Sequence, residues 1–138
     1  MAHKATRFHD ISVGHRVYGQ GGKCEHLHGH NYRIHFTLEA ELDGVGRVLD
    51  FSVIKEKLCM WLEDNWDHKF LIWENDFWAA MLENVDPTVV KTSFNPTAEN
   101  MAQYLVEVVG PMQLEGTGTR LICVTVDETR KCSASFNL

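Results

Sequence analysis

The chain has 138 residues, of which 44% are hydrophobic and 23% are charged, which is enough to bury the core of one soluble domain covering residues 1–138. Its formal net charge of -6, without any cluster of Lys and Arg, argues against a protein that binds nucleic acid or an anionic membrane. There is no run of about 18 apolar residues and no apolar N-terminal stretch. We therefore expect a cytoplasmic protein without a membrane span, whose four cysteines are reduced.

The first half of the chain predicts two strands followed by a helix. Residues 6–17 are expected to form one strand, and residues 30–42 form another in which apolar and polar side chains alternate. The apolar side chains of this second strand are Tyr32, Ile34, Phe36, Leu38, Ala40 and Leu42. A turn at residues 43–46 then leads to a helix over residues 52–65, for which Ser52 is the expected N-cap.

The second half predicts further helices and two more strands. A short helix is expected over residues 75–82 and an extended piece over residues 88–92. Thr97 is the expected N-cap of a helix whose apolar side chains are Met101, Ala102, Leu105, Val108 and Val109. Residues 120–128 and 132–136 predict two strands, the first with Ile122, Val124 and Val126 on one face. This order favours an α+β fold, in which an antiparallel sheet is covered by helices on one face.

Three histidines form the densest candidate for a metal centre. His28 and His30 are two residues apart at the start of a strand, so both side chains point to the buried face of Tyr32. Two partly buried imidazoles resist protonation together, and a metal ion would satisfy both. A hairpin would bring His15 beside them, and three histidines with an open position are typical of catalytic zinc. A His-x-His pair on a strand also occurs without any metal, and Glu39 is too far along the chain for a cupin-type iron site.

Four other residues are candidates for acid–base chemistry or binding. Cys24 lies four residues before His28, and a thiol beside a divalent cation can act as a thiolate base. Asp67 could orient His68 for proton transfer, although a surface pair is the usual alternative. Glu128 ends a strand on its apolar face, where a carboxylate could bind a guanine-like ring edge or turn to solvent. The remaining cysteines are interpreted as structural: Cys59, Cys123 and Cys132.

Taken together, these motifs resemble the 6-pyruvoyl-tetrahydropterin synthase family from about residue 7 to residue 136. The matching positions are His15, Cys24, His28-Gly29-His30, Asp50-Phe51, Asp67-His68-Lys69, Pro96-Thr97-Ala98-Glu99-Asn100 and Val126-Asp127-Glu128-Thr129. The resemblance implies the tunnelling fold (T-fold), with a four-stranded antiparallel sheet and two main helices on one face. It also implies a barrel-forming homohexamer, built as a dimer of trimers, with active sites between subunits.

The resemblance assigns a role to each candidate residue. It implies that Zn2+ is bound by His15, His28 and His30, and that catalysis uses Cys24, Asp67 and His68. It further implies that the substrate is a small pterin triphosphate, bound by Glu128 and Thr97. Three basic residues are candidates for contacting the triphosphate: Arg16, Lys23 and Lys131.

The spacing Cys-x-x-x-His-Gly-His resembles the family members that make 6-carboxy-5,6,7,8-tetrahydropterin in queuosine and 7-deazaguanine biosynthesis. These convert 7,8-dihydroneopterin triphosphate and also release acetaldehyde and triphosphate. Glu25, however, occupies the position of a glutamate that is found in another sub-type of the family. That sub-type cleaves dihydroneopterin-type substrates as an aldolase would. The alternatives are thus a 6-pyruvoyl-tetrahydropterin synthase, such an aldolase, an iron enzyme with the same histidines, or a non-catalytic zinc-containing pterin-binding protein. Residues 73–94 are interpreted as a surface insertion.

Overall fold

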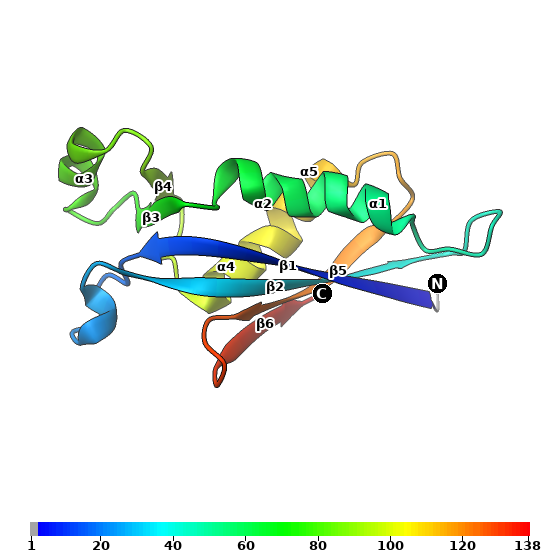
Figure 1. Cartoon of the computed structure of the whole chain (residues 1–138), viewed down its shortest axis with the longest axis horizontal. Coiled ribbons are helices and arrows are strands. Elements are labelled where there is room, and N and C mark those ends of the chain that lie inside the picture. Colours follow the sequence, from blue (N-terminus) through cyan, green and yellow to red (C-terminus); the bar gives the residue numbers. More distant parts are fainter. Residues whose placement is uncertain (1–2) are drawn as a thin grey trace.

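A computed structural model describes residues 3–138 as one six-stranded sheet with helices on one face (Figure 1). The strand order is β4-β3-β1-β2-β5-β6. The strands are β1 (His3–His15), β2 (His28–Ala40), β3 (Lys69–Trp73), β4 (Val90–Thr92), β5 (Arg120–Asp127) and β6 (Ser133–Asn137). The α+β arrangement predicted from the sequence is confirmed, and its four antiparallel strands are β1, β2, β5 and β6.

The long hairpin of β1 and β2 is the centre of the sheet. Its antiparallel register runs from His3 opposite Ala40 to His15 opposite His28. The alternation predicted for β2 is confirmed from Tyr32 to Leu38, where every second side chain is buried. The strand begins and ends two residues earlier than predicted, which leaves Leu42 exposed in the following turn.

A β-bulge changes which side chains of β5 face the core. The register of β5 against β2 shifts between Thr37 and Leu38. Because a bulge inserts an extra residue, the alternation reverses there, and Leu121 is buried instead of Ile122. Val124 and Val126, beyond the bulge, are buried as predicted.

Two long helical segments cover the sheet. The first comprises α1 (Phe51–Ile54), the π-helical turn η2 (Lys55–Cys59) and α2 (Met60–Asn65). Asp50, and not the predicted Ser52, is its N-cap, because the Asp50 carboxylate accepts a hydrogen bond from the backbone N–H of Ser52. The second comprises α4 (Ala98–Tyr104), the π-helical turn η3 (Leu105–Val109) and α5 (Gly110–Gln113), and Thr97 caps it as predicted.

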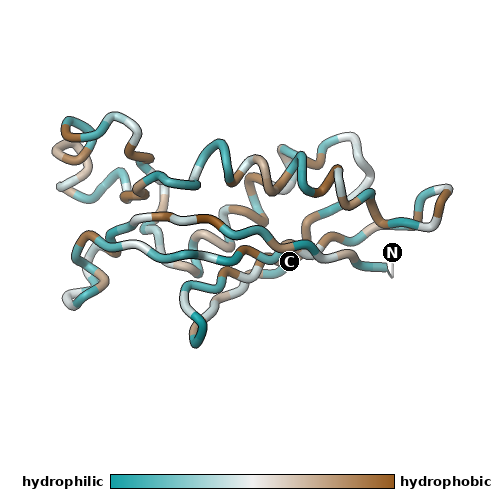
Figure 2. The backbone as a smooth tube through the Cα atoms, viewed as in Figure 1, coloured by the Kyte–Doolittle hydropathy of each residue, from teal (hydrophilic) through white to brown (hydrophobic). Residues whose placement is uncertain are grey.

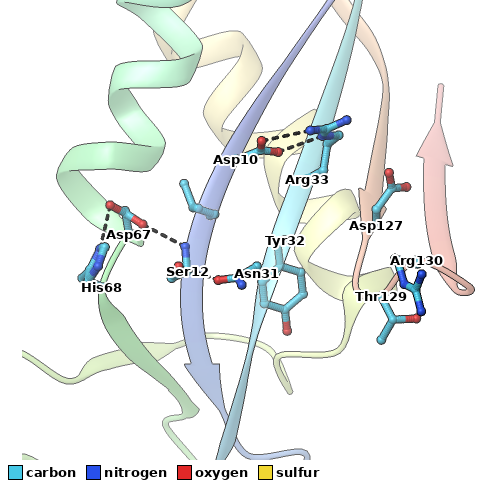
Figure 3. Close-up of a pocket in the computed structure, with 11 residues that line it drawn as sticks. Asp10, Ser12, Asn31, Tyr32, Arg33, Asp67, His68, Asp127, Thr129 and Arg130 are labelled. Atoms are coloured by element: carbon cyan, nitrogen blue, oxygen red, sulfur yellow. Dashed lines mark hydrogen bonds and ion pairs between the residues drawn. The ribbon is translucent and has the colours of Figure 1, made fainter.

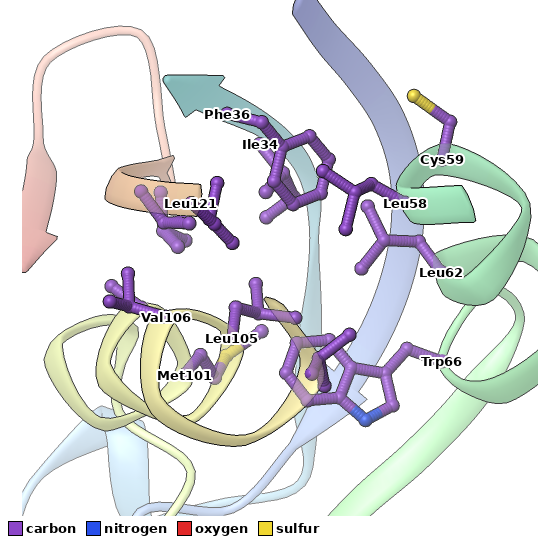
Figure 4. Close-up of a cluster of buried hydrophobic side chains, with 14 of the residues drawn as sticks. Ile34, Phe36, Leu58, Cys59, Leu62, Trp66, Met101, Leu105, Val106 and Leu121 are labelled. Atoms are coloured by element: carbon purple, nitrogen blue, oxygen red, sulfur yellow. The ribbon is translucent and has the colours of Figure 1, made fainter. Parts of the chain in front are cut away.

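The core lies between these helices and the sheet. The hydrophobic residues of the hairpin alternate along the chain, which is visible as colour changes along the tube of Figure 2. Figure 4 shows side chains from both helical segments meeting those of the sheet: Leu58, Leu62, Trp66, Met101, Leu105, Val106, Ile34, Phe36 and Leu121. Each large aliphatic or aromatic side chain buried here contributes about 1.5–3 kcal/mol. Cys59 belongs to this core, as predicted for a structural cysteine.

The segment of residues 73–94 is mostly exposed, as predicted for a surface insertion, but it also extends the sheet. It contains α3 (Ala79–Val85) and leads into β4, which pairs in parallel with β3, while β3 pairs in parallel with β1. The predicted four-stranded sheet is therefore extended to six strands. Within the segment, Asp76, Ala79 and Thr92 are buried. The segment and the β1–β2 loop lie at the same end of the molecule (Figure 1).

Within residues 3–138, no helix combines the length and the apolar character that crossing a membrane requires.

Candidate metal centre and active site

Three imidazoles meet at the end of the central hairpin where the loop joins β1 to β2. The β1–β2 register places His15 directly opposite His28, and His30 is the next residue of β2 on the same face. One ligand nitrogen from each ring lies within 4.8 Å of the others. The alternation of two adjoining strands thus converges on one point, as the sequence predicted.

Backbone carbonyl groups fix the tautomers of two of these rings. Nδ1 of His15 donates a hydrogen bond to the carbonyl of Pro96 at 2.7 Å, and Nδ1 of His28 donates to the carbonyl of His26 at 2.8 Å. A carbonyl only accepts, so each Nδ1 carries the proton and each neutral ring has a lone pair on Nε2. These two Nε2 atoms are 2.9 Å apart. Two facing lone pairs repel one another, and a shared cation would relieve that repulsion.

The third ring, that of His30, directs its Nε2 atom to the same cluster. Nε2 of His30 is buried and has no hydrogen-bond partner within residues 3–138. Burial is the main cause that lowers the pKa of His15 and of His30, so both rings are neutral near pH 7. His15 is only 1% exposed. Neutral, pre-oriented imidazoles with unsatisfied lone pairs fit a divalent cation such as zinc, which accepts three histidines and a further ligand.

Glu128 and Tyr32 border the imidazole cluster. Oε1 of Glu128 lies 3.7 Å from Nε2 of both His15 and His30, so this carboxylate faces the cluster and does not turn away to solvent. The Tyr32 hydroxyl donates to the same oxygen at 3.4 Å and lies 3.2 Å from Nδ1 of His15. From the sequence, Tyr32 was predicted only to be a core residue. Its place two residues after His30 on the same strand face was the signal that could have linked it to the site.

Cys24 lies in the β1–β2 loop, within the short 3-10 turn η1 (Lys23–Glu25), and is half-buried. Burial is the main cause that raises the pKa of Tyr32, followed by Glu128 and, to a smaller extent, Cys24. The loop that carries Cys24 begins after His15 and ends before His28, so it joins two of the three imidazoles.

Glu25, the residue next to Cys24, points elsewhere. Its two carboxylate oxygens accept hydrogen bonds from the backbone N–H groups of Gly19 at 3.0 Å and Gly21 at 2.8 Å. These bonds are the main cause that lowers the pKa of Glu25. A carboxylate held in this way stabilises the loop, which leaves Cys24 as the candidate base of this segment.

Asp67 and His68 form a hydrogen-bonded pair after α2 (Figure 3). Nδ1 of His68 donates to Oδ2 of Asp67 at 2.9 Å, while Oδ1 of Asp67 accepts from the backbone N–H of Ser12 at 2.8 Å. Burial opposes ionisation of Asp67, but these hydrogen bonds outweigh it and lower the pKa of this carboxyl group. His68 has a positive φ of 59° and a side chain that is 80% exposed. Asp67 thus orients an imidazole that is open to a ligand.

The pair is separate from the imidazole cluster within one chain. Asp67 and His68 line a depression of about 720 Å³ together with Ser12 and Asn31 (Figure 3). The side chain of Ser12 points to the opposite face of β1 from that of His15, because the two positions differ by an odd number of residues. In the described part of the chain, no hydrogen bond or ion pair joins His68 to any of the three clustered histidines.

Thr97 and Arg16 are already engaged in structural contacts. The Thr97 hydroxyl accepts a hydrogen bond from the backbone N–H of Asn100 at 3.1 Å, so its observed role is to cap α4. Arg16 was a candidate for contacting a triphosphate, but it is buried and paired with Asp76 at 2.9 Å. The sequence did not indicate this pair, because the two residues are distant in the chain.

Comparison with known proteins identifies the family. Residues 4–138 match the family described as 6-pyruvoyl tetrahydropterin synthase. A protein of Rickettsia bellii named 6-carboxy-5,6,7,8-tetrahydropterin synthase is 32% identical over 132 residues, covering 94% of this chain and 96% of the relative.

Solved structures agree in fold, which confirms the predicted T-fold class. An uncharacterised protein of Wolinella succinogenes superposes with a TM-score of 0.85 at 23% identity, covering 98% of this chain and 97% of the other. The 6-pyruvoyl tetrahydropterin synthase of Caenorhabditis elegans superposes with a TM-score of 0.71 at 24% identity, covering 98% and 94% of the two chains.

Proposed function

Because this chain belongs to the 6-pyruvoyl tetrahydropterin synthase family, we propose that it is a zinc-dependent lyase acting on a pterin triphosphate. The proposed reaction converts 7,8-dihydroneopterin triphosphate and water into 6-carboxy-5,6,7,8-tetrahydropterin, acetaldehyde and triphosphate. The product would serve queuosine and other 7-deazaguanine biosynthesis. The names of the relatives at about one-third identity support this reaction over others of the family.

The observation that carries the proposal is the meeting of the Nε2 atoms of His15 and His28, which lie 2.9 Å apart while the Nδ1 atom of each ring donates to a backbone carbonyl. His30 adds a third nitrogen, which has no hydrogen-bond partner within residues 3–138. We propose that these three residues bind zinc. A bound zinc ion would supply Lewis-acid chemistry, which makes protons on a substrate hydroxyl and its neighbouring carbon easier to remove.

The side chains around the cluster supply the proton transfers. Cys24, as a thiolate, would take a proton from the substrate. His68, oriented by Asp67 through its Nδ1, would exchange another proton at its exposed Nε2. Glu128 would accept hydrogen bonds from the N–H edge of the pterin ring, and Thr97 would border the ring at the start of α4.

We further propose that the active site lies between subunits of a homohexamer built as a dimer of trimers. The separation of the two halves of the site supports this arrangement. Within residues 3–138, no hydrogen bond or ion pair joins Asp67 or His68 to the imidazole cluster, and the His68 side chain is 80% exposed. A second copy of the chain could bring this exposed pair to the cluster of the first.

The position of Glu25 favours this reaction over the aldolase alternative. An aldolase-type glutamate must reach the substrate, whereas both carboxylate oxygens of Glu25 accept hydrogen bonds from loop N–H groups. Within residues 3–138, no hydrogen bond involves the Cys24 thiol, so the thiol is available to act as the base.

The test is mass spectrometry of the products that zinc-loaded protein forms from 7,8-dihydroneopterin triphosphate. We expect 6-carboxy-5,6,7,8-tetrahydropterin and acetaldehyde. Cys24→Ala should keep its zinc, measured by elemental analysis, and lose turnover, while the exposed Cys132→Ala should keep both. A 6-pyruvoyl product or a cleaved side chain would point to the other activities of the family. Binding without turnover would point to a non-catalytic pterin-binding protein, and full activity of Cys24→Ala would remove the proposed base.

A further inference from the structure

A buried ion pair ties the end of β1 to the segment of residues 73–94. Nε of Arg16 donates to Oδ2 of Asp76 at 2.9 Å, and the two side chains are 4% and 0% exposed. Removing one partner of such a pair leaves an uncompensated buried charge, so the two residues hold one another firmly. Arg16 directly follows His15, and Asp76 precedes α3.

Aromatic rings fix the orientation of the Arg16 guanidinium group. Its central carbon lies 3.8 Å from the centre of the Trp78 ring, 5.7 Å from that of Phe77 and 5.8 Å from that of Tyr18. The negative face of an aromatic ring attracts a cation, most strongly where water is excluded. Trp78 and Phe77 come from the same segment as Asp76, so this segment supplies both the counter-charge and two of the rings.

Asp76 is itself held rigidly. Its Oδ1 accepts from the backbone N–H of Trp78 at 2.9 Å. Its own backbone N–H donates to the carbonyl of Trp73, and its carbonyl accepts from the backbone N–H of Ala79, both at 2.9 Å. The carboxylate is thus presented to Arg16 from a fixed turn.

The contacts continue from Arg16 into the β1–β2 loop. Nη2 of Arg16 lies 3.5 Å from Oε2 of Glu25, whose oxygens accept the N–H groups of Gly19 and Gly21. Both glycines have positive φ, a conformation that other residues rarely adopt. Cys24 is the neighbour of Glu25, and its carbonyl accepts from the backbone N–H of Val17 at 2.9 Å. The position of the Cys24 thiol therefore depends on how this loop is held.

We propose that Asp76 is a positioning residue, which through Arg16 and Glu25 holds the loop of residues 16–27 and so fixes the position of Cys24 between His15 and His28. The effect on catalysis rests on the proposed function of Cys24, whereas the effect on the loop does not. The segment of residues 73–94 is then a support for the active site.

Asp76→Asn tests this proposal in the zinc-loaded, full-length protein. The change keeps the shape of the side chain and removes its charge. Amide hydrogen exchange in the loop should become roughly 10- to 100-fold faster, the factor expected for loss of one hydrogen bond to a charged group. Exchange within β2 serves as the internal reference and should not change. With bound zinc still present, kcat should fall about tenfold or more, because misplacing a catalytic group by about 1 Å has such an effect, while KM changes little.

Glu83→Gln is the matched control, since it breaks the exposed ion pair of Glu83 with Lys91 in the same segment. It should leave loop exchange and kcat unchanged. If Asp76→Asn does not fold, Glu25→Gln replaces it, because Glu25 lies at the surface and links Arg16 to the loop.

Each outcome decides the proposal. Unchanged loop exchange in Asp76→Asn, or faster exchange with an unchanged kcat, would overturn it. For Glu25→Gln, loss of turnover without faster loop exchange would do the same and would mark Glu25 as a catalytic base. If the unaltered protein makes no product from 7,8-dihydroneopterin triphosphate, the proposed function fails, but the exchange measurements still test how the loop is held.

Discussion

Gly29, between His28 and His30, is the position where the smallest change should disturb the metal centre most. A Cβ atom added there would lie 2.9 Å from the backbone carbonyl oxygen of Val13 and 3.3 Å from Cα of Gly14. Ordinary contacts begin at 3.4 Å, so Gly29→Ala must push β1 and β2 apart by about half an ångström. The obstacle is backbone, which cannot rotate away as a side chain can.

The expected cost has two parts. Overpacking of this kind destabilises a protein by about 1–3 kcal/mol. Pushing β1 away from β2 also moves His15 away from His28. Zinc affinity should therefore fall by roughly 10- to 100-fold, which is the usual effect of altering the groups that orient metal ligands. Thermal unfolding of the metal-free protein measures the first effect, and competition with a chromophoric chelator measures the second.

Gly44→Ala is the control, because a Cβ at Gly44 meets nothing within 4 Å. It should leave both stability and zinc affinity unchanged. If Gly29→Ala bound zinc as tightly as the unaltered protein, the close approach of the two strands would not be what sets the ligand geometry, and this reasoning would be refuted.

Three further predictions concern the residues around the cluster. Thr97→Ala should lower the free energy of unfolding by about 1 kcal/mol in urea denaturation, because it removes the cap of α4, whereas Thr97→Ser should keep the cap. Glu128→Gln should retain zinc by elemental analysis but raise the KM for the pterin substrate, and an unchanged KM would contradict its role as ring anchor. Burial lowers the pKa of His15 and His30, so below the ordinary imidazole pKa of about 6.5 the unfolded chain binds more protons than the folded one. The free energy of unfolding of the metal-free protein, measured by urea denaturation, should therefore be highest above about pH 6.5 and decrease as the pH falls below it. A free energy of unfolding that does not change with pH in this range would contradict the lowered pKa values of His15 and His30.

The sequence predicted well whatever depends on alternation along one strand. The period of two in β2 placed His28 and His30 on the face of Tyr32, and the structure confirms that the three candidate ligands converge. The same reasoning gave the wrong residue in β5, where Leu121 and not Ile122 is buried. A bulge has no signature in the hydrophobic pattern, since it is set by the register with the neighbouring strand.

Contacts between distant segments were beyond the reach of the sequence. Asp76 and Arg16 are of residue types that usually lie at the surface, and only the folded chain shows that they form a buried ion pair. The same holds for the carbonyl of Pro96, which orients His15 from a loop 81 residues away. A motif such as Pro96-Thr97 can therefore be recognised in the sequence, while its physical role emerges only from the structure: one residue fixes a ligand tautomer, and the next caps a helix. Pro96 acts on the site through its backbone carbonyl, so replacing its side chain should leave this contact with His15 in place, whereas Thr97→Ala removes the hydroxyl that caps α4.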